Sequence, residues 1–215
     1  MPDPIRQLDC LDIAAGAGKP APPVSRRTET PHVASETRQR ILDVARTLFC
    51  SQGYARTPLR AISDSLGVTK AALYYHFRAK DDLLAAIVSP LLHRIDEMLD
   101  APDASLPEPG QRRAFLVAYV EELIAHADII ALLIRDHGVG QHPLGRRFAS
   151  QHTRMRELLG AGAGPASVIR TTTALRTLEL AVIEFSGSQP AVVRDTALTM
   201  AIAVLDSGPG AGNEA

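Results

Sequence analysis

The sequence predicts an all-α protein that is divided into a small N-terminal and a larger C-terminal helical domain. Apolar residues recur at spacings of three and four from about residue 35 to residue 205, which is the period of amphipathic helices. Nowhere do apolar and polar residues alternate as they do in a strand, and no segment repeats another. Hydrophobic residues make up 46% of the 215 residues, which is enough to bury a sizeable core.

The chain is expected to begin with a tail that is followed by one long helix. Residues 1–34 are rich in proline, alanine and glycine and show no periodicity, so they are expected to be disordered. The alternative is a minor-groove arm that carries Arg26 and Arg27. Ser35 is expected to cap the first helix, which runs up to Gly53. Its apolar stripe consists of Ile41, Val44, Ala45, Leu48 and Phe49.

Two short helices joined by a sharp turn are expected at about residues 58–77. Thr57 fits an N-cap, and Pro58 fits the first helical position, where its missing amide hydrogen costs nothing. Gly67 supplies the left-handed residue that ends the first helix, and Thr69 caps the second. Such a pair is a helix-turn-helix, whose second helix enters the major groove of DNA.

The second of these two helices has an inner and an outer face. Leu73 and Phe77, four residues apart, form the inner stripe. On the outer face, alanines let the backbone approach base edges, a lysine can reach a guanine or a phosphate, and tyrosine and histidine tips can bond to phosphates. The alternative is a packed helical corner with a solvated face, but two adjacent outward tyrosines argue against it. The outer face consists of Lys70, Ala71, Ala72, Tyr74, Tyr75 and His76.

The distribution of charge agrees with a nucleic-acid partner for this domain. The formal net charge of the chain is −1, but residues 35–81 carry eight basic and four acidic side chains. This segment is therefore at about +4 and the rest of the chain at about −5, which is typical of a local phosphate-binding surface on an acidic protein.

Residues 38–57 (RQRILDVARTLFCSQGYART) and 66–84 (LGVTKAALYYHFRAKDDLL) resemble the first helix and the helix-turn-helix of the tetracycline-repressor-like (TetR) family of dimeric transcriptional regulators. The family often has Gly-Thr where this chain has Ala71 and Ala72, so one hydroxyl contact is lost and the operator preference is not carried over. The DNA contacts that the resemblance implies lie on Arg60, Thr69, Lys70, Ala71, Ala72, Tyr74, Tyr75, His76 and Lys80.

The number of cysteines and the composition of the N-terminus favour a cytoplasmic protein. Cys10 and Cys50 are the only cysteines and are not in CxxC spacing, which fits a reducing compartment. The N-terminus carries acidic residues and lacks the apolar core of a signal peptide. No apolar run approaches the roughly 18 residues that are needed to span a membrane.

The C-terminal domain is expected to contain several helices. The first of them runs to about Asp100 and is kinked but continuous at Pro90, and the resemblance implies that it links the two domains. A proline-rich connector follows at 101–110, and glycine-rich breaks are expected at 138–145 and 160–165.

The last two helices are expected at residues 165–186 and 190–205. The second is apolar nearly all round, and the end of a monomer offers too little cover for such a helix. Pairing with a second copy would cover it. The resemblance implies the same arrangement, a four-helix dimer interface built from residues 165–205 of each copy.

An apolar cavity for a small-molecule effector is expected among the helices of the C-terminal domain, although each lining residue taken singly is equally suited to the core. Aromatic residues are only 4% of the chain, which disfavours a flat polyaromatic ligand. A smaller or aliphatic ligand, and an anionic one in particular, suits Arg135 better. The candidate lining is Met98, Phe115, Tyr119, Leu132, Phe148, Met155 and Leu178, with His126, Arg135 or His152 as polar anchors.

Other chemistry finds little support in the sequence. His126, His137, His142 and His152 are not spaced as in zinc motifs such as HExxH, so no metal and no cofactor are expected. No serine or cysteine stands in a nucleophile elbow such as GxSxG, so catalysis is not expected either.

We therefore expect a homodimeric DNA-binding transcriptional regulator, a repressor that a small molecule releases from a palindromic operator. One alternative is an activator or a ligand-independent regulator. A remote alternative is an enzyme that uses the helix-turn-helix only for packing. The expected organisation is a tail at 1–34, a DNA-binding domain at 35–81, a ligand-sensing and dimerisation domain at 82–206 and a flexible tail at 207–215.

Overall fold

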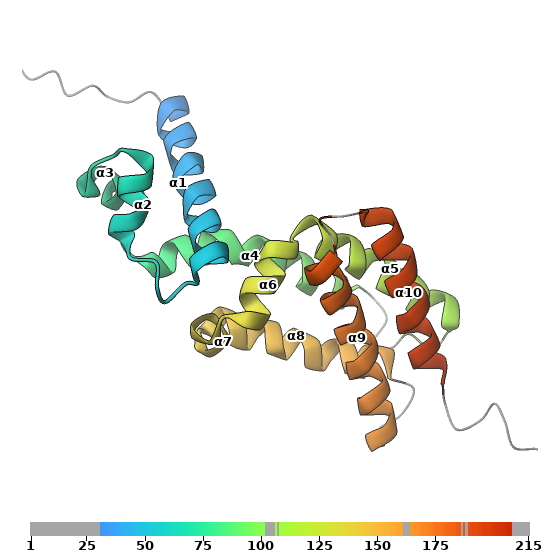
Figure 1. The fold of residues 1–215 in the computed structure, drawn as a ribbon. Coiled ribbons are helices and arrows are strands. Elements are labelled where there is room, and N and C mark those ends of the chain that lie inside the picture. Colours follow the sequence, from blue (N-terminus) through green and yellow to red (C-terminus); the bar gives the residue numbers. More distant parts are fainter. Residues whose placement is uncertain are drawn as a thin grey trace, which may run out of the picture.

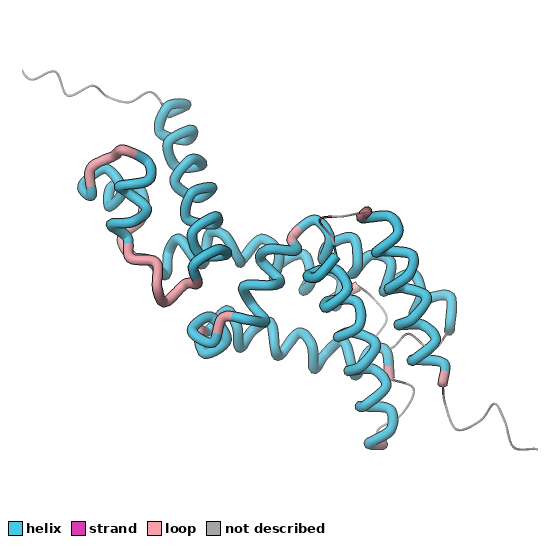
Figure 2. Tube along the Cα trace, viewed as in Figure 1, coloured by secondary structure: helices cyan, strands magenta, loops and turns pink. Residues whose placement is uncertain are grey.

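The computed structural model describes residues 31–101, 106, 108–160, 164–185, 187 and 189–207, and this part of the chain contains ten α-helices and no strand (Figures 1 and 2). The expected all-α fold is thus confirmed. Within the same residues no helix is both long and apolar enough to cross a membrane. The helices are α1 (Pro31–Gln52), α2 (Leu59–Leu66), α3 (Lys70–His76), α4 (Lys80–Leu99), α5 (Pro109–Ala125), α6 (Ala127–Arg135), α7 (His137–Gln141), α8 (Pro143–Leu159), α9 (Pro165–Phe185) and α10 (Pro190–Asp206).

Helix α1 begins at Pro31, so the expected cap at Ser35 is wrong and the last four residues of the expected tail are helical. A proline suits this position because its ring fixes φ near the helical value and the first amides of a helix have no partner in it. The rest of the expected tail, with Arg26 and Arg27, and the C-terminal residues 208–215 lie outside the described residues.

Helices α2 and α3 lie beside α1 at one end of the molecule (Figure 1). Pro58 (φ −75°, ψ 153°) takes the N-cap position of α2, so the expected cap at Thr57 is wrong. Thr57 is instead buried, and its hydroxyl donates to the carbonyls of Gly53, at 2.9 Å, and Leu48, at 3.3 Å. Its side chain therefore ties the connection before α2 to the end of α1.

Helix α4 joins the two domains (Figure 1). It runs through Pro90 to Leu99 without interruption, as expected. At its start the Asp82 carboxylate accepts a hydrogen bond of 3.0 Å from the amide of Ala79, which caps the helix. The helix packs on α1 near this end and on α5 and α8 farther along, so its buried side chains belong to both cores.

In the C-terminal domain α9 and α10 share the most extensive contact, and both also pack on α5 (Figure 2). The expected break at 138–145 is wrong, because the short α7 and the first turn of α8 occupy it. A Cβ atom at Gly145 would lie only 2.1 Å from the carbonyl oxygen of Val139, so α7 and α8 meet backbone to backbone there.

Candidate nucleic-acid interface and ligand groove

The turn between α2 and α3 has the geometry that the sequence predicts. Gly67 has φ 66° and ψ 28°, the left-handed conformation that ends α2. The hydroxyl oxygen of Thr69 accepts a hydrogen bond of 3.2 Å from the amide of Ala72 and so caps α3. Leu73 and Phe77 are 1% and 3% exposed, so the inner face of α3 is fixed against the domain core.

Six of the nine predicted DNA-contacting residues belong to α3, Thr69 caps this helix, and Arg60 and Lys80 lie on α2 and α4. Tyr74 and Tyr75 are 49% and 78% exposed, which is unusual for large aromatic side chains. Lys70 and Ala71 are also exposed, while Ala72 and His76 are half-buried. Arg60, on α2, is exposed and pairs with Asp64 at 3.3 Å, one helical turn away.

Lys80 differs from the other candidates because its ammonium group is engaged within the protein. The Nζ atom donates to the carbonyl of Tyr54 at 2.7 Å and lies 4.2 Å from the centre of the Tyr54 ring. Burial lowers the pKa of Lys80. The Tyr54 hydroxyl in turn donates to the Asp81 carboxylate. The lysine therefore holds the end of α1 to the start of α4, and a phosphate would have to compete with these contacts.

Two aspartates of the C-terminal domain hold the DNA-binding domain in place. Asp128, at the start of α6, accepts two hydrogen bonds of 2.6 Å from the guanidinium of Arg46 on α1. Asp136 accepts from the amide of Tyr54 at 2.7 Å with one oxygen and from the amide of Val139 at 3.0 Å with the other. The second bond caps α7, so one carboxylate serves both domains.

Cys50 lies in this same contact, 3.5 Å from the carbonyl oxygen of Asp128. Burial, together with the nearby Asp128 carboxylate, raises the pKa of its thiol to about 12. The thiol is thus a poor nucleophile at neutral pH, as expected of a core cysteine.

A groove of about 510 Å³ lies between α8 and α9, and residues of α6 and α7 also line it. Two of the ten predicted ligand-binding residues, Phe148 and His152, line it. A third, Tyr119, is fully buried beneath it and donates to the Glu179 carboxylate at 2.8 Å. Three of the ten predicted residues thus lie at or next to this groove, and their role in ligand binding stays a prediction.

The other seven candidates do not line the groove. Arg135 is exposed and forms an ion pair with Glu184, and His126 bonds to the carbonyl of Glu122 on the preceding turn, so neither is a polar anchor there. The remaining five are wholly or partly buried and pack in the hydrophobic core, namely Met98, Phe115, Leu132, Met155 and Leu178. No three histidine, cysteine, aspartate or glutamate residues of the described chain gather as a metal site would require.

The polar centre of the groove is Glu179, which the sequence-based list of candidates omitted. Its side chain is 0% exposed and accepts from Arg176 at 2.7 Å and from Tyr119. Nε2 of His152 lies 2.6 Å from the same carboxylate. Burial and this carboxylate raise the pKa of Tyr119 well above its ordinary value. A glutamate within the apolar stripe of α9 was the available signal, since an ionised group is buried only with partners.

Comparison with known proteins points in the same direction as the geometry. The model of the bacterial regulatory proteins of the tetR family matches residues 41–87. HTH-type transcriptional regulator AcrR of Shigella flexneri is 49% identical over 59 residues, which are 27% of this chain and 27% of that protein. HTH-type transcriptional regulator TtgR of Pseudomonas putida is 34% identical over 104 residues, which are 47% of this chain and 49% of that protein. The aligned part of the chain thus spans between about a quarter and a half of the length of these relatives.

The whole fold also has a counterpart. The crystal structure of a member of the TetR transcriptional regulator family from Streptomyces coelicolor superposes with a TM-score of 0.62 at 24% identity and covers 77% of this chain and 89% of that chain. These relatives are described as transcriptional regulators and not as enzymes. The match at residues 41–87 and the shared all-helical architecture lead to one conclusion: α1–α4 form a helix-turn-helix domain similar to that of the tetR-family regulatory proteins, within a fold that the chain shares with the Streptomyces coelicolor protein.

Proposed function

We propose that the protein is a homodimeric cytoplasmic repressor that binds a palindromic DNA operator and leaves it when a small molecule occupies the C-terminal domain. The observation that carries the DNA-binding part is the open face of α3. Tyr74 and Tyr75 are 49% and 78% exposed beside Lys70, on a helix whose opposite face is buried. A buried major-groove interface would remove this apolar surface from water and would give both hydroxyls phosphate partners.

A second copy of the chain is the proposed partner of α9 and α10. Six of the eight large apolar side chains that are exposed in the described residues lie on these two helices. Three of them border a groove of about 440 Å³ between α9 and α10. An apolar surface of this extent is typical of an interface, and a two-fold axis would let each copy cover the other. The six side chains are Val168, Ile169, Leu180, Phe185, Val192 and Met200.

Release by a ligand is proposed because the α8–α9 groove adjoins the contact between the domains. Ile134 and Gly140 are part of its wall, and Asp136 lies between them in the chain and bonds to Tyr54. A ligand that prefers another position of α7 would shift this contact and with it the DNA-binding domain. Two recognition helices fit successive major grooves only when they are about 34–36 Å apart, so such a shift lowers DNA affinity.

Selection of bound sequences from a random DNA pool tests the proposal. The expected result is a palindrome whose half-sites lie one helical turn apart, because the two α3 helices of a symmetric dimer read equal sequences. The same selection with Tyr75→Ala is the comparison. This variant lacks an exposed side chain of α3, so it should stay folded but enrich no sequence. Enrichment of no sequence by the wild type would contradict the proposal. An unchanged operator affinity throughout a saturating ligand screen would favour the alternative, an activator or a ligand-independent regulator.

A further inference from the structure

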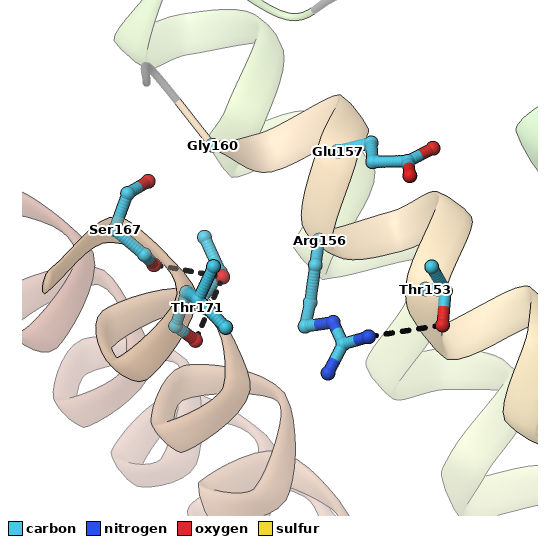
Figure 3. A pocket seen from close by; sticks show the side chains of 7 residues that line it. Thr153, Arg156, Glu157, Gly160, Ser167 and Thr171 are labelled. Atoms are coloured by element: carbon cyan, nitrogen blue, oxygen red, sulfur yellow. Dashed lines mark hydrogen bonds between the residues drawn. The ribbon is translucent and has the colours of Figure 1, made fainter. Parts of the chain in front are cut away.

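Arg156 lies between two hollows that run along α8 and α9. It lines the groove of about 510 Å³ described above and also a second hollow of about 460 Å³ at the other end of the two helices. Figure 3 shows its guanidinium between α8 and α9, on the same side as Ser167 and Thr171. Thr153 is shared by both hollows in the same way. The arginine is thus accessible to a ligand from either hollow.

The charge of Arg156 is not neutralised within the described part of the chain. The only hydrogen bond of its guanidinium there is to the hydroxyl of Thr153, at 2.9 Å. The neighbouring Glu157 carboxylate points away from it (Figure 3). A guanidinium presents up to five donors in a planar fork that matches a carboxylate, so most of its donor capacity is unused.

The other charged groups of the groove are already paired. The Glu179 carboxylate is held by Arg176 at 2.7 Å and by the Tyr119 hydroxyl at 2.8 Å, and it also lies 2.6 Å from Nε2 of His152. It therefore offers little to a cationic ligand. With Arg176 and Glu179 cancelling each other, Arg156 leaves the groove with an excess positive charge.

The remainder of the groove is largely apolar. Phe148, Leu175 and Leu180 form part of its lining, together with Leu133 and Ile134 at the end near α6. Its volume of about 510 Å³ falls within the roughly 300–1,000 Å³ of small-molecule sites. Such a site suits a ligand with one anionic head and a hydrocarbon body.

We propose that the α8–α9 groove binds a small aliphatic carboxylate, whose head group pairs with the Arg156 guanidinium and whose hydrocarbon chain lies on Phe148 and Leu175. The inference rests on the proposed function in that this carboxylate would be the effector. Among the three polar anchors expected from the sequence, Arg135 was the one suited to an anion. Arg156 on α8 takes that role instead of Arg135 on α6.

Calorimetric titration of the full chain with hexanoate, octanoate and decanoate tests the proposal without DNA. Each acid is compared with its neutral amide of equal length. The expected result is saturable binding of at least one carboxylate, about 10- to 100-fold tighter than its amide, since a charge-assisted hydrogen bond is lost with the charge. Arg156→Gln should remove this preference, and Arg156→Lys, which keeps a point charge, should retain part of it.

The matched control is Arg146→Gln, which removes the same charge from an exposed position of α8 outside the groove. It should bind like the wild type, and unchanged melting temperatures would show that all variants are folded. The proposal is overturned if no carboxylate of the series binds, if carboxylate and amide bind equally, or if Arg156→Gln keeps the preference. Binding at Arg156 with unchanged operator affinity would instead refute ligand release and leave the site standing.

Discussion

Adding one methyl group at Gly67 and the same group at Gly110 should change stability in opposite directions. Gly67 ends α2 with φ 66°, whereas Gly110 is a helical residue of α5 without a positive φ. A Cβ atom at either position meets no other heavy atom within 4 Å. The difference between Gly67→Ala and Gly110→Ala is therefore a difference of backbone conformation alone.

The expected magnitudes follow from that conformation. A left-handed backbone costs an L-residue roughly 1–2 kcal/mol, so Gly67→Ala should destabilise by about this amount. Gly67→Asn should cost less, because asparagine tolerates the left-handed region, and Gly67→Val should cost more, because it is β-branched. Gly110→Ala should stabilise by up to about 1 kcal/mol, the difference in helix propensity between the two residues.

Urea unfolding followed by circular dichroism measures these changes, and operator binding shows their functional effect. Gly67→Val should also lower operator affinity, because the turn sets the angle between α2 and α3, while Gly110→Ala should leave it unchanged. Equal shifts of the urea midpoint in Gly67→Ala and Gly110→Ala would refute the reasoning, since the left-handed conformation would then carry no cost.

Three further substitutions test the proposed dimer surface and two contacts of the DNA-binding domain one at a time. Met200→Glu places a charge on the exposed stripe of α10 and should give monomers in sedimentation at micromolar concentration, whereas Tyr75→Glu, on another exposed aromatic, should leave the dimer intact. Lys80→Met should lower stability by about 1–3 kcal/mol, because it removes a charged hydrogen bond of 2.7 Å, and an unchanged urea midpoint would contradict this role. Burial alone would raise the pKa of Asp128, but the hydrogen bond and charge of Arg46 outweigh it and lower that pKa in the folded protein. This pair therefore stabilises the protein above the unfolded pKa of about 3.9, and the stabilisation is lost as the pH falls through the folded pKa. Asp128→Asn should accordingly cost up to about 1 kcal/mol at pH 7 and progressively less below about pH 4, and a cost that stays constant in urea titrations across this range would speak against the ion pair.

The sequence predicted those features that depend on neighbouring residues. Gly67 and Thr69 act within a few residues of themselves, so a left-handed end and a helix cap could be inferred from the letters alone. The buried stripe of Leu73 and Phe77 followed from helical period in the same way. The prediction failed where a side chain could bond in two ways. Thr57 is of a residue type that caps helices, but its hydroxyl bonds to the end of α1.

The lining of the α8–α9 groove was predicted least well because its contacts join residues far apart in the chain. Arg135 and Arg156 are both arginines on amphipathic helices, and only the fold shows that Glu184 pairs with the first. Helical periodicity likewise did not decide which apolar side chains of α10 are buried within the protomer and which are exposed on its surface. Ala201 is fully buried beside α9, whereas Met200, one position earlier, is 54% exposed.

The two aspartates that join the domains differ in the partner that each requires in the DNA-binding domain. This difference determines which segments of related proteins could replace α1–α3. Asp136 binds a main-chain amide at position 54, which every residue except proline provides. Asp128 binds the guanidinium of Arg46, which only a basic residue at that position can replace. A chimera that receives a foreign segment in place of α1–α3 would thus keep the first attachment unless the donor has proline at position 54. It would keep the second only if the donor has a basic residue at the position of Arg46.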